Sequence, residues 1–518
     1  MTPLEPLDLR GIVGRVERAV AAAGHEPWLV GYDANAIQEL ITSSGRPISM
    51  RGASEAILGF DNQVRERELA IFAGGGRGVV IARSERDATE RTRTLVDRYR
   101  AATRGGVMAT CAVPLERGAG EAQSIRWLRH RLDIAKDAAL PPGGALPSAK
   151  EDECAYCRRH LATHERMRDG EPEKVCAQCS AMLDRGHDAG RVRGERRGEM
   201  SQSIEDIATE GWIAVLSADG NSLGALFESL GTLGELAVVS EAVAASFQRA
   251  QEQALAPIPD DKRLPLVTGG DDVRAFLPPG EVLGYVERLT HAVEALAADH
   301  ARAASGLISR PIVDRLGRLG IGIGAVIASV YYPAWRLVDH AHQLEDSAKA
   351  ACRKHDWRSG FDFTVVTTED MMTARPPRAL QRGDILPLAP GSEQWRGALD
   401  KAGALARIPS AQLAILSNAS VANDARDSRA QVARSSERAS EEGERSRDIA
   451  AEPSPEPHVS EEELGNVLRY QVARSDVWRA WYTACGVDWR DPAAVLAHRP
   501  RRDALQLARL LSFGGPLR

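Results

Sequence analysis

The sequence predicts an α+β protein that contains two ferredoxin-like domains, a zinc ribbon between them and a C-terminal helical domain. Two observations predict the ferredoxin-like domains. The order strand, helix, hairpin, helix, strand occurs twice, and each copy has a glycine-rich hairpin in the same place. A third observation, two CxxC pairs between the copies, predicts the ribbon. The expected boundaries are residues 1–150, 151–185, 200–375 and 376–518.

The composition is that of a large globular protein. With 518 residues, of which 43% are hydrophobic and 27% charged, the chain is too long for a single core. A formal net charge of -6 argues against a protein that coats nucleic acid through charge alone, although it permits a local basic groove. The sequence has no apolar run as long as a membrane span and no signal-peptide pattern, so we expect a cytoplasmic protein without a membrane partner.

The first copy begins with a strand, PWLVGYDAN, that ends at Asp33. The helix AIQELITSS, two strands that fold back at Gly74–Gly76, the amphipathic helix ERDATERTRTLVDRYRAAT and the strand GVMATCAVP follow it. We expect this copy to be a scaffold without a metal site, because its hairpin reads GGG and carries no carboxylate.

The second copy repeats this order with an acidic hairpin. Its first strand, GWIAVLSADG, ends at Asp219, and the helices NSLGALFESL and Leu236–Ala256 precede the hairpin LPLVTGGDDVRAFLP. A long helix, the strand LGIGIGAVIASVYYP, the helix WRLVDHAHQLEDSAKAACRK and the strand FDFTVVTT complete it. Three glycines lie on one face of the first of these strands, which indicates close packing rather than a dinucleotide site: Gly320, Gly322 and Gly324.

Three carboxylates of the second copy are expected to form one acidic centre. The first and third strands of a ferredoxin-like sheet are antiparallel neighbours, so Asp219 should lie near Asp271 and Asp272. Such carboxylates repel one another unless a cation is present, and Mg²⁺ or Mn²⁺ prefers oxygen ligands together with substrate phosphates. A bulge at Gly269 and Gly270 would be needed for both hairpin aspartates to touch metal, and Asp272 is the weaker of the two candidates. The alternative interpretation is a charged hairpin tip without a function.

Other side chains near this centre are candidates for binding phosphate. Asn221 or Ser222 is expected to cap the next helix, whose free N–H groups suit a triphosphate. Lys349 lies on the helix after the fourth strand, where it either reaches phosphate or is a solvated surface lysine. The sequence has no GxxxxGK[ST] motif, so it does not support P-loop chemistry.

The cysteine pairs predict a structural zinc site. Cys154 and Cys157 are followed, after 18 intervening residues, by Cys176 and Cys179, which is the spacing of a Cys₄ zinc ribbon. Four thiolates leave no open coordination position, so we expect a structural role. Two histidines of this segment, His160 and His164, are near enough to be alternative ligands, but we expect them outside the zinc site.

The C-terminal region is expected to be helical with one disordered interruption. Residues 418–463 are rich in Ser, Ala, Arg and Glu, a composition that cannot bury a core. From Leu464 onward, Leu and Trp recur at helical spacing.

With these motifs in this order, the chain resembles the large subunit of type III CRISPR effector complexes, a family of paired palm polymerases and cyclases. The resemblance covers about residues 28 to 370. Its first part is GYDANAIQELITSSGRPISMRGAS and the hairpin AGGGRGVVIA, which is similar to the metal-free hairpin of the family's first palm. WIAVLSADGNSLGALF and LVTGGDDVRAFLP resemble the second palm, and YYPAWRLVDHAHQLEDSAKA resembles its closing helix. The Cys₄ insert lies between the palms, as in the family.

The resemblance implies an activity and partners. The family's second palm joins ATP into cyclic oligoadenylates, using Mg²⁺ or Mn²⁺ at the GGDD, when the complex binds target RNA. The resemblance therefore implies that Asp219, Asp271 and Asp272 bind metal. It also implies three kinds of partner: guide RNA, target RNA and other protein subunits. Two departures stand out: Asn221 replaces an acidic residue that many members carry, and the first palm starts by Trp28, so we expect no HD nuclease domain.

Two other functions stay open at this point. One is a scaffold subunit whose palm binds RNA or nucleotide but reacts weakly or not at all, an interpretation that Asn221 keeps open. The other is a stand-alone cyclic-nucleotide synthase of the diguanylate type, whose usual GG(D/E)EF hairpin does not fit the residues DDVRAF here.

Overall fold

The computed structural model describes residues 7–138, 152–168, 170–192, 204–267, 270–366, 387–406, 502–513 and a few positions between 479 and 491. It divides into two compact units. The first consists of Met1–Ala379 with Pro387–Pro390, and the second of Leu380–Leu386 with Gly391–Arg518. The segment expected to be disordered and Gly269 both lie outside the described residues.

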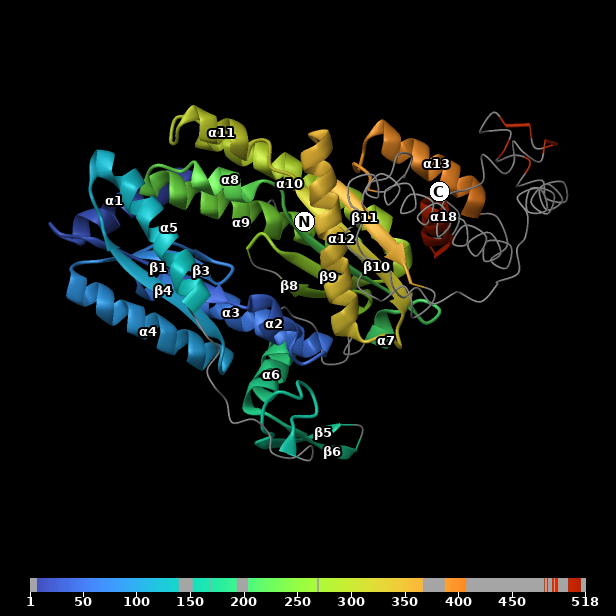
Figure 1. Ribbon diagram of the computed structural model, residues 1–518, viewed down its shortest axis with the longest axis horizontal. Coiled ribbons are helices and arrows are strands. Elements are labelled where there is room, and N and C mark those ends of the chain that lie inside the picture. The colour runs from blue at the N-terminus through green and yellow to red at the C-terminus, as the bar shows by residue number, and fades with distance from the viewer. Residues whose placement is uncertain are drawn as a thin grey trace, which may run out of the picture. The chain divides into compact units, whose positions relative to one another are not determined.

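The first palm is a four-stranded antiparallel sheet in the order β2-β3-β1-β4 (Figure 1). Its strands are β1 (Trp28–Asn35), β2 (Ala70–Gly74), β3 (Arg77–Ala82) and β4 (Val107–Pro114). Residues alternate between its faces: Tyr32 stacks edge-on against Phe60 of α3 (Pro47–Arg67), whereas the backbone at Gly31 lies against Leu128 of α5 (Glu121–Ala138). This is the ferredoxin-like order that the sequence predicts.

The second palm has the same strand order with one strand added. The sheet runs β11-β10-β7-β9-β8, in which β11 is parallel to β10 and the other neighbours are antiparallel. Its strands are β7 (Trp212–Gly220), β8 (Leu264–Val267), β9 (Val273–Leu277), β10 (Ile321–Ser329) and β11 (Gly360–Val365). The repeated order confirms the α+β class with two ferredoxin-like palms.

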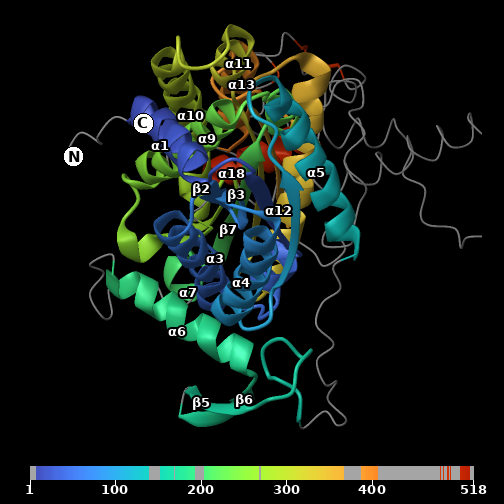
Figure 2. The ribbon, with the colours of Figure 1, turned by 90° about the vertical axis from the view of Figure 1, so that its left-hand side faces the viewer.

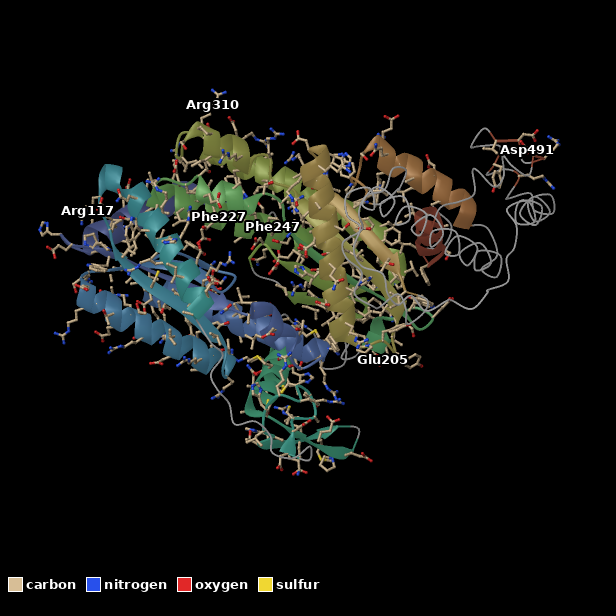
Figure 3. The ribbon with its side chains drawn as sticks, in the orientation of Figure 1. Arg117, Glu205, Phe227, Phe247, Arg310 and Asp491 are labelled. Carbon is tan, nitrogen blue, oxygen red and sulfur yellow. The ribbon has the colours of Figure 1, made fainter. Side chains whose placement is uncertain are left out.

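Two helical layers cover the second sheet. α9 (Leu233–Leu255) packs along α10 (Val282–Ala304). Phe247 of α9, labelled in Figure 3, lies close to the end of β7, since a Cβ on Gly220 would lie 3.0 Å from its ring. On the other face, α12 (Ala334–His355) packs on β10, β7 and β11. The close approach that the glycines of β10 predict is present, because a Cβ on Gly324 would lie 2.1 Å from the Ala341 carbonyl oxygen of α12.

One hydrophobic core joins the two palms and the helix that follows the ribbon. It contains Val30 and Phe60 of the first palm, Val215 and Phe276 of the second, and Met182 of α6 (Ala177–Val192). The backbones of α3 and α6 touch, since a Cβ on Gly52 would lie 1.7 Å from the Met182 carbonyl oxygen. Figure 2 shows α6 below α3 with the ribbon hairpin, β5 (His164–Arg168) and β6 (Glu171–Val175), beyond it.

Further helices complete the two units. In the first unit they are α1 (Leu9–Ala22), α2 (Ile37–Thr42), α4 (Glu85–Thr103), η1 (Gly118–Gly120), α7 (Ile204–Ile207), α8 (Leu223–Glu228), η3 (Asp260–Lys262), η4 (Pro279–Glu281) and α11 (Arg310–Leu316). In the second unit, α13 (Glu393–Ala406) and α18 (Arg502–Phe513) pack against each other and are helical, as expected there. Among the described residues, no helix is long and apolar enough to cross a membrane.

The sequence patterns miss α1 and α5, which lie before and after the strands of the first palm in the chain, and α3 between those strands. α3 has no single apolar stripe, because α4 and β2 cover one part of it and α6 covers another, and even Arg51 and Asp61 are buried in it. In the second palm, α9 begins at Leu233 rather than at Leu236, because the Thr232 hydroxyl accepts a hydrogen bond from Glu235 N at 3.1 Å.

Candidate active site in the second palm

The three predicted carboxylates lie near one another at one edge of the second sheet. β7 and β9 pair with Ala218 opposite Val273, so the end of β7 lies beside the residues that precede β9. Burial, and then the neighbouring Asp219 and Asp272, raise the pKa of Asp271 to about 7. This crowding of negative charge is the condition under which a divalent cation is favoured.

The two hairpin aspartates have different surroundings. Asp271 lines the cavity described below together with Asp219, whereas Asp272 does not line it. Burial raises the pKa of Asp272, and the nearby guanidinium of Arg274 opposes that rise. Arg274 donates to Ser217 Oγ at 3.3 Å, and Ser217 in turn donates to Glu345 of α12. The charge near Asp272 therefore belongs to the group of polar side chains between the sheet and α12.

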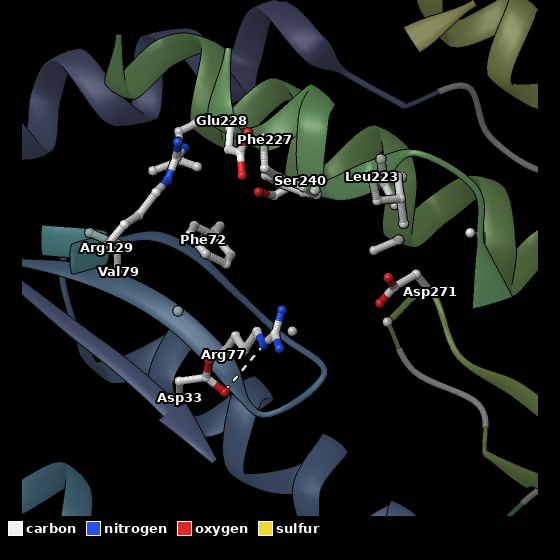
Figure 4. A pocket seen from close by; sticks show the side chains of 18 of the residues that line it. Asp33, Phe72, Arg77, Val79, Arg129, Leu223, Phe227, Glu228, Ser240 and Asp271 are labelled. Atoms are coloured by element: carbon white, nitrogen blue, oxygen red, sulfur yellow. Dashed lines mark hydrogen bonds and ion pairs between the residues drawn. The ribbon is translucent and has the colours of Figure 1, made fainter. Parts of the chain in front are cut away.

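A cavity of about 730 Å³ lies in front of Asp271, between the two palms (Figure 4). This volume is in the range of nucleotide-sized ligand sites. The first palm contributes Asp33, Phe72 and Arg77, and Figure 4 shows the Arg77 guanidinium on the opposite side of the cavity from Asp271. The second palm contributes the residues expected near phosphate: Gly270, Asn221, Ser222 and Lys349.

The expected helix cap next to the acidic centre is right in position, but its side chain does not cap the helix. Ser222 is the N-cap residue of α8, but its side chain makes no capping hydrogen bond. The Asn221 amide instead donates to the Arg358 carbonyl oxygen at 2.8 Å, and the Asn221 N–H donates to the Gly320 carbonyl oxygen at 3.0 Å. Asn221 therefore ties the end of β7 to the loops at Gly320 and Arg358.

Lys349 is not a solvated surface lysine. Its side chain is 14% exposed, and its amine is hydrogen-bonded to Asp219 and lies 2.8 Å from an oxygen of Glu345. Burial by itself lowers the pKa of Lys349, but Glu345 and Asp219 outweigh it and raise the pKa above the ordinary value. The amine therefore stays charged at the cavity, close to the place of the expected metal.

The first palm has cations where the second has carboxylates. Asp33 occupies the strand position equivalent to Asp219, and it pairs with Arg77 at 3.2 Å and Lys136 at 3.0 Å. Arg77 lies opposite Asp33 in the register of the first palm. In the second palm the register between β7 and β9 ends at the pair Ala218 and Val273, and Asp272 directly precedes that pair. The first palm thus neutralises its strand-end aspartate with its own side chains.

The four cysteines lie together as a metal site requires. The Sγ atoms of Cys154, Cys157, Cys176 and Cys179 are within 4.8 Å of one another, and all four residues are buried. Four thiolates at such distances fit tetrahedral Zn²⁺. His160 Nδ1 is 3.6 Å from Cys157 Sγ, and the His164 ring contacts the Thr163 hydroxyl at 2.8 Å. Neither histidine belongs to the four-cysteine cluster.

A comparison with protein families now identifies the second palm. Residues 212–357 match the family described as "Cas10/Cmr2, second palm domain". The chain carries a Cas10/Cmr2 second palm. This match confirms the family that the motifs around Asp219 and the GGDD hairpin indicated. A comparison with curated proteins gives no match.

Solved structures with the same fold come from Csm1–Csm4 cassettes. The cassette in complex with pppApApA matches with a TM-score of 0.52 at 13% identity, over 95% of this chain and 72% of that one. The cassette in complex with cA4 matches with a TM-score of 0.51 at 14% identity, over the same shares. In the match to the cassette with AMPPNP, which has a TM-score of 0.43 at 14% identity, 64% of this chain spans only 55% of the other.

Proposed function

We propose that this Cas10-like chain is a nucleotidyl cyclase that makes cyclic oligoadenylates from ATP within a type III CRISPR effector complex. The observation that carries the proposal is the placement of Asp219 and Asp271 at a nucleotide-sized cavity, with the Lys349 amine beside them. The related cassettes support it, because they are complexes with cA4 and pppApApA. We infer that the partners are other effector subunits, as in those cassettes, and through them guide and target RNA.

The residues present fit a divalent cation. Asp219 and Asp271 would hold Mg²⁺ or Mn²⁺, because both line the cavity and their charges repel without a cation. When bound, such a cation activates the attacking 3′-hydroxyl and stabilises the pyrophosphate that leaves. We assign Asp272 a smaller share in metal binding, since it does not line the cavity and the charge of Arg274 acts on it.

The other residues of the site bind and orient the substrate. Lys349 offers a charged amine to phosphate, and Asn221 fixes the turn after β7 through its bond to the Arg358 carbonyl oxygen. Gly270 lines the cavity without a side chain, so the backbone of the hairpin lies open to a ligand. The four cysteines would hold structural Zn²⁺.

A specific observation favours a second candidate, a scaffold subunit with a weak palm. Asn221 stands where many family members carry an acid, and its side chain is already committed to the Arg358 carbonyl oxygen. The acidic centre then depends on Asp219 and the hairpin aspartates alone.

Incubation with ATP and Mn²⁺, followed by mass spectrometry of the products, tests the proposal. We expect cyclic oligoadenylate from the wild-type effector complex with target RNA bound. Asp271→Asn should lower its formation roughly a hundredfold or more, because a charged metal ligand is lost, and Asp272→Asn should lower it less. Asp346→Asn, at an exposed position of α12, is the matched control and should have no effect.

Two outcomes contradict the proposal. Absence of any oligoadenylate from the wild-type complex, with target RNA present, would favour the scaffold. Product that forms at the wild-type rate after Asp271→Asn would contradict the assignment of Asp271 to the site.

A further inference from the structure

A buried carboxylate lies behind the acidic centre. Glu345, in the middle of α12, has no solvent exposure. One of its oxygens accepts a hydrogen bond from Ser217 Oγ at 2.7 Å and lies 3.3 Å from His342 Nδ1, and the other lies 2.8 Å from Lys349 Nζ. The proposed reaction does not by itself require Glu345.

Glu345 is ionised in spite of its burial. Burial raises its pKa, but hydrogen bonding to His342 and the charge of Lys349 outweigh that effect and lower the pKa to about 2. An apolar side chain would fill a buried site beneath a helix at lower cost than a charge does. Packing alone would therefore favour an apolar residue at this position, so the charge of Glu345 indicates another role.

The neighbouring glycines fix where this charge lies. A Cβ on Gly322 would lie 2.5 Å from Lys349 Cγ, and one on Gly324 would lie 2.3 Å from the Glu345 nitrogen. α12 therefore lies directly against β10 at Gly322, the residue that pairs with Asp219 of β7. The Lys349 amine is held from two sides, by Glu345 beneath the helix and by Asp219 at the cavity.

We propose that Glu345 is a positioning residue, which holds the Lys349 amine at the cavity so that it stays oriented toward substrate phosphate when Asp219 binds a divalent cation. This inference rests on the proposed function. Among the described residues, Asp219 is the other carboxylate paired with Lys349. Without the charge of Glu345, the amine would rely on Asp219 and compete with the cation for it.

A double-mutant cycle between Glu345 and Lys349 tests this step. The probe is the α,β-methylene analogue of ATP, which cannot release pyrophosphate, titrated with Mn²⁺ by calorimetry on the full chain. We expect Glu345→Gln to weaken binding of the analogue about tenfold in the wild-type background. In the Lys349→Met background the same change should weaken it less than about twofold, because Glu345 acts through the amine.

Two further variants separate positioning from folding. Ser217→Ala removes one hydrogen bond to Glu345 and keeps the charge, so it should cause a smaller loss that also disappears in the Lys349→Met background. Glu68→Gln is the matched control, since Glu68 is a carboxylate held by Arg91 and Arg98 in the first palm, and it should leave binding unchanged. Thermal melts of all variants report whether they fold.

The outcomes distinguish this inference from the proposed function. Equal losses from Glu345→Gln in the two backgrounds would overturn the positioning role and leave the proposed function standing. A wild-type chain that binds neither Mn²⁺ nor the analogue would overturn both. If Glu345→Gln does not fold, a Ser217→Ala loss that persists with Lys349→Met would overturn the positioning role.

Discussion

At the scale of single residues, the partners of an aspartate decide what it can do. Asp33 and Asp219 end equivalent strands, but two protein cations pair with Asp33. Asp219 shares the one amine of Lys349 with Glu345 and lies beside two further aspartates. The first palm is therefore balanced by its own side chains, whereas the second has an excess of negative charge at the cavity.

A buried aspartate of the first palm makes stability depend on pH. Asp61 accepts hydrogen bonds from the Tyr32 hydroxyl at 3.0 Å and from Gly76 N at 2.9 Å, and so fixes the GGG hairpin. Burial raises its pKa from 3.8 to about 6, even though both hydrogen bonds lower it. The folded protein thus holds a proton that the unfolded chain releases, and stability falls as the pH rises between these values.

We expect Asp61→Asn to remove this dependence. As the pH rises from about 4 to about 7, wild-type stability should fall by up to about 3 kcal/mol relative to the variant, which has no proton to lose at this position. Urea unfolding of both proteins at a series of pH values measures the difference. Parallel pH profiles for the two proteins would show that Asp61 is not protonated in the fold.

At the scale of elements, the close contact between β10 and α12 holds Lys349 and Glu345 of α12 beside the acidic centre. Gly324→Ala should destabilise the protein by about 1–3 kcal/mol, because the new Cβ would lie 2.1 Å from a backbone carbonyl oxygen of α12. Gly59→Ala is the matched control in α3, where nothing lies within 4 Å of the added Cβ, and it should stabilise by about 0.5–1 kcal/mol. Thermal melts measure both, and equal melting temperatures for the two variants would contradict the close contact.

Local patterns predicted the repeated elements because strand alternation, the glycine hairpins and the CxxC spacing are properties of short segments. They also predicted the meeting of Asp219 with the hairpin, since the ferredoxin-like order alone brings these strands together. They could not predict α3, which is buried on several sides, or Glu345, whose role depends on partners 128 and 4 positions away. Nor could they distinguish a solvated Lys349 from a paired one, because Lys349 lies on a helix and its partner Asp219 lies 130 positions away on β7.

At the scale of the first compact unit, the two palms depend on each other. Leu264 and Phe276 of the second palm share one core with Val64 of α3, and α3 packs along β8. At the cavity the hairpins touch, since a Cβ on Gly75 would lie 3.5 Å from the Gly270 Cα. Separating the palms would expose apolar surface on both, and apolar burial is the main favourable contribution to folding.

A fragment that contains only the second palm should therefore be much less stable than the two palms together. We expect residues 204–366 to melt on the order of 10 °C below residues 1–379, or to aggregate, because the side of β8 that faces α3 becomes exposed. Differential scanning calorimetry of both fragments measures this, with size-exclusion chromatography to detect aggregation. The longer fragment should unfold in one transition that includes both palms. Two separate transitions, the later one matching the isolated second palm, would show that the second palm folds without help from the first.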